Sequence, residues 1–178
     1  NQSSLKPSVE PTSNQNIQYI YTDGACVHNG TPQAKAGIGV YYGVEHDKRN
    51  LSETFEGKQT NNIAEVKAVL SAYHQIMKEN DANTTYIIYT DSKYTLGYAT
   101  YSGEKHHKQN WKKNIPNKDL VKQLYQRISS QPNIQLKHIK AHTNHKNIHS
   151  LGNEQADKLA NRAIGYTHCP YDVSQRIY

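Results

Sequence analysis

Four acidic side chains occupy positions from which they could hold divalent cations. Asp23 and Asp91 end the strand-like runs 17–23 and 85–90, and ligands of open α/β sheets bind at the carboxyl ends of strands. Glu65 and Asp157 flank the apolar stripes of two predicted helices. Four converging carboxylates would stay ionised only with cations between them, and oxygen ligands suit Mg²⁺ or Mn²⁺. Two such ions, about 3.5–4 Å apart, can clamp the attacking and leaving oxygens of a phosphodiester. Taken singly, each acid fits equally well as a helix cap or a surface charge.

The charge of the chain suits a protein that binds nucleic acid and equally a basic soluble protein that binds no specific anion. It has 21 Lys and Arg against 15 Asp and Glu, a net charge of +6, and a pI near 9.2, which is typical of nucleic-acid binders. Basic residues crowd around the single tryptophan, Trp111: Lys105, His106, His107, Lys108, Lys112, Lys113 and Lys118. We expect this segment to follow phosphates or to be a solvated loop, and Trp111 to line a nucleic-acid channel or to pack in the core. A second cluster, over 137–149, is rich in histidine, but a zinc site there would lack cysteine ligands.

Length and composition limit the protein class. The 178 residues suit one domain, and no run approaches the roughly 18 apolar residues of a membrane span. Cys26 and Cys169 are too few for a disulfide framework or a four-cysteine zinc site. Residues 1–16, rich in Ser, Asn, Gln and Pro, predict a disordered leader, and 166–178 a loosely packed tail. The start at Asn1 without a signal peptide indicates an excerpted or processed chain of intracellular origin, from cytoplasm, nucleus or mitochondrion.

Between the two ends, the hydrophobic periodicity predicts an α/β domain over 17–165. Alternation predicts strands at 17–23, 51–57 and 133–139. A run bounded by glycines predicts a strand at 36–43, and a short apolar run predicts one at 85–90. Apolar spacing of three and four predicts helices at 61–80, from Ser92 onward, after Asp119, and from Gly152–Asn153 to Gly165. The order β-β-β-α-β-α-α-β-α gives a mixed five-stranded sheet, with three antiparallel strands followed by parallel crossovers and with helices on its faces.

The short sequence motifs around the four acids resemble those of a known family. They read Y-T-D-G-A at 21–25, T-N-N-I-A-E at 60–65, Y-T-D-S at 89–92, K-A-H-T-N-H at 140–145 and G-N-E-Q-A-D-K-L-A at 152–160. In this order, over about residues 17–165, the chain resembles the type 1 ribonuclease H family, in its cellular, eukaryotic form more than in the retroviral domain. The resemblance implies the ribonuclease H-like fold and an endonuclease that hydrolyses the RNA strand of RNA/DNA hybrids with two Mg²⁺ ions, for which Mn²⁺ can substitute. One metal would activate water and the other would stabilise the departing 3′-oxygen, leaving 5′-phosphate and 3′-hydroxyl ends.

Residue roles also follow from the resemblance. Asp23, Glu65, Asp91 and Asp157 would bind the metals, and His142 would assist proton transfer or product release. The RNA strand would be read through its 2′-hydroxyls by three amides: Asn29, Asn61 and Asn62. A DNA-strand phosphate would be gripped by three other side chains: Lys58, Thr60 and Asn117. The basic segment is shorter than the family's, so we expect a remodelled protrusion with Trp111 as a channel candidate.

Two alternative functions are less consistent with these motifs. A hybrid-binding module without catalysis would have no use for four carboxylates beside phosphates, and a transposase or resolvase of related fold would not need the 2′-hydroxyl-reading T-N-N word at 60–62. The expected partner is an RNA/DNA hybrid, and the expected state is a monomer without membrane attachment. A further fused domain is compatible with an excerpted chain.

Overall fold

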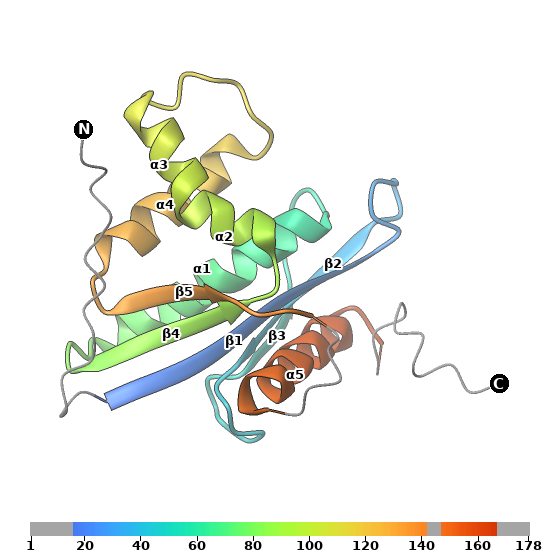
Figure 1. Ribbon diagram of the computed structural model, residues 1–178. Helices are drawn as coiled ribbons and strands as arrows, with labels where there is room; N and C mark the ends of the chain where they lie inside the picture. The colour runs from blue at the N-terminus through green and yellow to red at the C-terminus, as the bar shows by residue number, and fades with distance from the viewer. Residues whose placement is uncertain (1–15, 142–146, 167–178) are drawn as a thin grey trace.

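Five strands form one mixed sheet in the order β3-β2-β1-β4-β5 (Figure 1). The computed structural model describes residues 16–141 and 147–166, so the expected leader and tail lie almost wholly outside the described residues. The strands are β1 (Asn16–Val27), β2 (Lys35–Tyr41), β3 (Leu51–Thr54), β4 (Thr84–Thr90) and β5 (Ile134–His138). The first three pair antiparallel, whereas β4 pairs parallel with both β1 and β5. The predicted mixed sheet is thereby confirmed.

Helices cover both faces of this sheet. They are α1 (Asn61–Glu79), α2 (Lys93–Ala99), α3 (Tyr101–Lys108), α4 (Lys118–Ser130) and α5 (Ile148–Ala163). α1 shares the main apolar core with α2, α4 and one sheet face, and α5 packs on the other face (Figure 1). Within the described ranges, no helix has the length and apolar character needed to span a membrane.

Side chains alternate along β1 between the two faces of the sheet, so this strand contributes to the apolar packing on both faces. Ile20 is fully buried in the core with α1 residues such as Val66 and Val69, and each such side chain contributes about 1.5–3 kcal/mol. Tyr21, the next residue, faces α5, where its hydroxyl lies 2.8 Å from His149 Nδ1. Odd-numbered β1 residues therefore face α5 and even-numbered residues face α1.

Two glycines let helices approach the strands closely. A Cβ on Gly24 would lie 2.5 Å from the backbone nitrogen of Glu65, and one on Gly39 would lie 2.1 Å from the carbonyl oxygen of Ala156. Neither space admits a side chain, so α1 lies directly on β1 and α5 directly on β2. These two approaches bring Glu65 and Asp157 close to the strand that carries Asp23.

The helix boundaries differ from the prediction in two places. α3 was not predicted, because only Gly103 and His106 of its eight residues are buried and no apolar stripe marks it. The expectation that Gly152 and Asn153 precede the last helix is wrong, since α5 already begins at Ile148. Asn147 caps this helix by accepting from two backbone N–H groups. Gly152 lies inside it because the Tyr21 ring, 2.5 Å from an ideal Cβ position, leaves no room for a side chain.

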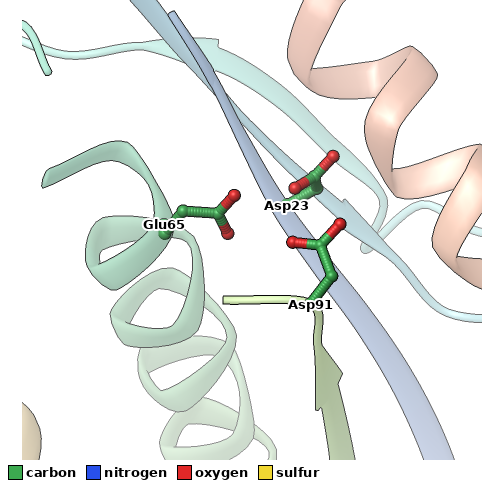
Figure 2. A group of neighbouring side chains, drawn as sticks. All are labelled: Asp23, Glu65 and Asp91. Carbon is green, nitrogen blue, oxygen red and sulfur yellow. The ribbon is translucent and has the colours of Figure 1, made fainter. Parts of the chain in front are cut away.

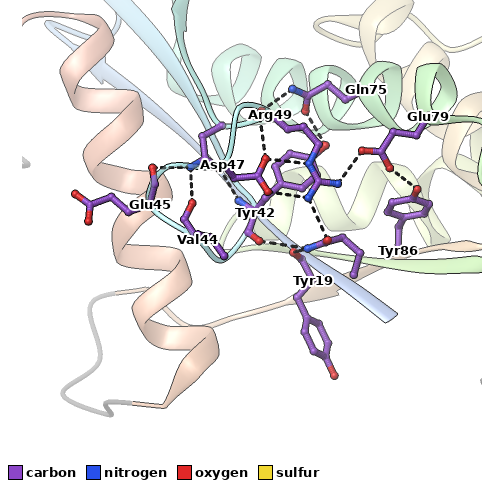
Figure 3. Close-up of polar contacts among 11 residues, drawn as sticks. Tyr19, Tyr42, Val44, Glu45, Asp47, Arg49, Gln75, Glu79 and Tyr86 are labelled. Atoms are coloured by element: carbon purple, nitrogen blue, oxygen red, sulfur yellow. Dashed lines mark hydrogen bonds and ion pairs between the residues drawn. The ribbon is translucent and has the colours of Figure 1, made fainter. Parts of the chain in front are cut away.

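A polar network holds the far end of α1 (Figure 3). Arg49, in the β2–β3 loop, pairs with Asp47 at 2.8 Å and with Glu79 at 2.7 Å, and its guanidinium lies over the Tyr42 ring. Gln75 donates to the Arg49 carbonyl oxygen at 2.6 Å. Because Glu65 lies near the opposite end of α1, this network stabilises the fold without taking part in the acidic cluster.

Candidate active site

Three carboxylates meet where β4 ends beside β1. Asp23 comes from β1, Glu65 from α1 and Asp91 from the residue after β4, and their candidate ligand oxygens all lie within 4.8 Å of one another (Figure 2). Pairing of β1 with β4 stops at Thr22 and Thr90, whereas β1 continues to Val27. Side chains from both faces of the sheet can therefore meet beyond the end of β4.

The helix start fixes the position of Glu65. Thr60 caps α1, since its Oγ1 accepts from the Ile63 N–H at 3.1 Å, so α1 begins at Asn61. Glu65 then lies one turn into the helix, against Gly24, whose N–H donates to the Glu65 carboxylate. The T-N-N-I-A-E motif thus contains both the helix cap and the acid, and the cap fixes the helix start so that the acid lies against Gly24 of β1.

Burial and crowding raise the pKa of two of these acids. Asp23 and Glu65 are each 4% exposed. Burial, and then the neighbouring Glu65 and Asp91 charges, raise the pKa of Asp23 well above its usual range. Burial and Asp91 raise the pKa of Glu65 to about 8, against the lowering effect of hydrogen bonds from Asp23 and Gly24. Without a bound cation, the Asp23 and Glu65 carboxyl groups therefore keep protons to a higher pH than exposed acids do.

This donor set fits a divalent metal of the magnesium type. All three groups offer oxygen, the ligand that Mg²⁺ and Mn²⁺ prefer. Among the described residues, Glu65 Oε2 is buried with no hydrogen-bond partner, although buried acceptors are nearly always satisfied. A bound cation would satisfy this oxygen and would permit the three acids to ionise together.

A cavity of about 450 Å³ extends from the three carboxylates to the fourth acid. Asp157, on α5, lines it together with Asn161. The Asn161 amide, 2% exposed, donates to the Asp157 carbonyl oxygen at 2.9 Å and to Oδ1 at 3.1 Å. Three of the four predicted carboxylates thus lie together, and the fourth lines the same cavity, where a buried amide donates to it.

Two of the three predicted RNA-reading amides line the same cavity. Asn29 follows β1 and Asn61 opens α1, and the Asn61 backbone N–H donates to Asn29 Oδ1 at 3.3 Å. Asn62 is exposed at the next helix position, and the structure does not place it among the cavity-lining residues.

The remaining predicted contacts lie outside this cavity. Lys58 is exposed in the loop before α1, and Asn117 precedes α4, where its amide donates to the Tyr94 hydroxyl at 3.2 Å. Trp111 is only 6% exposed and stacks on the His106 ring at 5.5 Å, which favours the core-packing alternative over channel lining. His142 lies outside the described residues.

Sequence reasoning missed Asn161 and Gln59. Asn161 stands four residues after Asp157 on the same helix, a spacing that places the two on one face and could have revealed it. The Gln59 side chain binds three backbone groups around the loop that carries Lys58. One of its partners lies 23 residues away, and no local pattern marks such a contact.

Comparison with known proteins agrees with this geometry. The RNase H family matches residues 15–165. The chain is 35% identical over 169 residues to Ribonuclease H1 of Homo sapiens, covering 88% of this chain and 56% of that protein. It is 34% identical over 155 residues to Ribonuclease H of Schizosaccharomyces pombe, covering 82% and 52%. It therefore spans about half the length of these curated relatives.

A solved structure with the same fold is Prototype Foamy Virus Protease-Reverse Transcriptase, in a CSH mutant. The likeness has a TM-score of 0.69 at 28% identity and covers 91% of this chain and 22% of the viral one. The family match covers all four carboxylates, Asp23, Glu65, Asp91 and Asp157. This chain belongs to the RNase H family.

Proposed function

We propose that this protein is an endonuclease that hydrolyses the RNA strand of RNA/DNA hybrids with two divalent metal ions. The observation that carries the proposal is the meeting of Asp23, Glu65 and Asp91 within 4.8 Å, in a cavity that Asp157 also lines. Clustered acids beside phosphates hinder simple binding, because they repel the substrate. With cations they become a site for phosphodiester hydrolysis.

The carboxylates have distinct tasks in this proposal. Asp23 and Glu65, both buried, anchor the metal on the protein side, and Asp91 and Asp157, partly exposed, face the open side of the cavity. Two Mg²⁺ ions, or Mn²⁺ in their place, would supply an activated water and would compensate the charge on the departing 3′-oxygen. The products would carry 5′-phosphate and 3′-hydroxyl ends.

Strand selection rests on short amides beside the acids. Asn29 and Asn61 line the cavity, and Asn62 follows on the exposed start of α1. Amide groups both donate and accept hydrogen bonds, as a 2′-hydroxyl does. The Asn61 N–H holds Asn29 in place, so this pair can read the RNA strand with little loss of conformational freedom on binding.

The DNA strand would meet positive and polar groups further from the acids. Lys58 and Thr60 lie immediately before α1, and Asn117 lies at the start of α4. We assign to them the binding of one DNA-strand phosphate. Lysine provides charge there without the two-pronged geometry of arginine. The basic segment from Lys105 to Lys118 would add phosphate contacts that weaken with salt.

Cleavage of labelled duplexes tests the proposal. The same sequence is offered as RNA/DNA hybrid, double-stranded DNA and double-stranded RNA, with Mg²⁺ or with EDTA. We expect cleavage of the RNA strand of the hybrid alone, loss of cleavage in EDTA, and products that a 5′-phosphate-dependent exonuclease degrades. Asp23→Asn should abolish cleavage but retain hybrid binding, because it removes one metal ligand and one negative charge. Cleavage of double-stranded DNA, or near-normal turnover by Asp23→Asn, would refute the proposal.

A further inference from the structure

The Gln59 side chain makes three hydrogen bonds that hold the loop connecting β3 with α1, and we call these three bonds the Gln59 clip. Its Oε1 accepts from the Ala36 backbone N–H at 2.9 Å, which ties the loop to β2. Its Nε2 donates to the carbonyl oxygens of Phe55 at 2.8 Å and of Gly57 at 3.0 Å. One side chain therefore joins three points of the backbone.

These three bonds determine the orientation of the amide. Oε1 accepts from an N–H group, and Nε2 donates to two carbonyl oxygens. A flipped amide would place its amino group against the N–H and its oxygen against the two carbonyl oxygens, so all three bonds would be lost. The turn that the clip closes contains Gly57 with φ of +97°, a conformation that suits glycine. The shape of residues 55–60 therefore depends on Gln59 and on this turn.

The clip lies between two functional regions. Lys58 precedes Gln59 and Thr60 follows it, and both belong to the proposed phosphate contact. On its other side, the Gln59 carbonyl oxygen lies 4.0 Å from the Cys26 thiol, and Cys26 lines the acidic cavity. Gln59 itself does not line the cavity among the residues that the structure describes, so any influence on the substrate must act through its neighbours.

We propose that Gln59 is a positioning residue that preorganises Lys58 and Thr60 to bind a phosphate of the DNA strand. This inference rests on the proposed function. A loop already held in its binding shape loses little conformational freedom when it meets a ligand, whereas a loosened loop must be ordered at that moment. Gln59 should therefore affect the affinity for the hybrid and leave the chemical step unchanged.

The first test separates positioning from simple stabilisation. Gln59→Met keeps length and apolar volume but removes all three bonds, and Gln59→Glu keeps the acceptor for Ala36 but loses both donors. Gln75→Met is the matched control, because it also removes two glutamine bonds, to Tyr42 and to Arg49, at the far end of α1. We expect KM and the hybrid Kd in EDTA to rise about 5-fold for both Gln59 variants, with kcat within about 2-fold of the parent's. Gln75→Met should lower Tm without changing KM or Kd.

The second test asks whether the clip acts through Lys58. In a double-mutant cycle, Gln59→Met should weaken hybrid binding much less in a Lys58→Ala background than in the parent. Labelling of the Cys26 thiol, in a Cys169→Ser background, should be faster when the clip is lost, because the loop beside Cys26 loosens.

Several outcomes would overturn the inference: additive effects in the cycle, an equal rise of KM for Gln75→Met, or a fall in kcat with KM unchanged. A parent that binds hybrid in EDTA without cleaving it in Mg²⁺ would instead refute the proposed function. The Kd comparison would then still decide the role of Gln59. A parent that binds no hybrid refutes both.

Discussion

Replacing Glu65 by Gln is expected to stabilise the metal-free protein above neutral pH. The folded protein holds the pKa of Glu65 at about 8, against an ordinary value of 4.5. Between these values the native carboxyl keeps a proton that the unfolded chain has lost, so the free energy of unfolding falls as pH rises. The fall is about 1.4 kcal/mol per pH unit, or about 5 kcal/mol over the whole interval. Glutamine does not ionise and can still accept from the Gly24 N–H.

The expected gain is about 3–5 kcal/mol at pH 9, because the buried amide has its own desolvation cost, and less than about 1 kcal/mol at pH 5. Urea unfolding in EDTA at the two pH values measures it. Glu79→Gln is the control on the same helix, since it loses the Arg49 pair and should destabilise by about 0.5–1.5 kcal/mol at both pH values. Mg²⁺ should stabilise the parent more than Glu65→Gln, because the proposed metal site uses the ionised carboxylate.

The pH dependence is the decisive part of this prediction. A gain of equal size at both pH values would mean that glutamine simply packs better, and no gain at the higher pH would mean that Glu65 ionises there without cost. Either result would refute the argument that crowding of buried acids destabilises the metal-free fold.

Three further predictions concern other parts of the molecule. His142→Ala should slow turnover about 10²-fold without abolishing it, the range for one acid–base group, and a rate unchanged between about pH 6 and 9 would remove this role. Lys112→Ala with Lys113→Ala should raise KM and make its salt dependence shallower, by about 0.9 in log–log slope per lost phosphate contact; an unchanged slope would leave these lysines as solvated surface. Gly39→Ala should destabilise by about 3 kcal/mol in urea unfolding, because its Cβ would meet the Ala156 carbonyl oxygen at 2.1 Å; a parent-like midpoint would contradict this close approach.

The sheet and the acidic cluster could be predicted because local patterns determine them. Asp23 and Asp91 follow apolar strand runs, and parallel pairing of β1 with β4 places both at one edge. Glu65 follows a helix cap by one turn, as the T-N-N-I-A-E word implies. In each case the chemistry-bearing residue lies beside the signal that positions it.

Features that depend on tertiary contacts escaped prediction. α3 buries little more than Gly103 and His106, so its helical state has no apolar stripe to reveal it. The sequence left Trp111 between channel lining and core packing, and the choice depends on a turn in which Asn110 and Trp111 both have φ of +54° and the indole stacks on His106. Gly152 indicated a helix boundary, yet it lies inside α5 because of the Tyr21 ring, a partner more than a hundred residues away.

The positions of the four acids along the sequence have a consequence for biosynthesis. Asp23, Glu65 and Asp91 leave the ribosome well before Asp157, which belongs to the last helix that the structure describes. At about 5–20 residues per second, synthesis of the intervening segment takes several seconds. During that time the α5-facing side of β1 and β2 stays uncovered, and the cavity has only three of its acids. A nascent chain therefore completes its group of four acids only after α5 has been synthesised and has docked on β1 and β2.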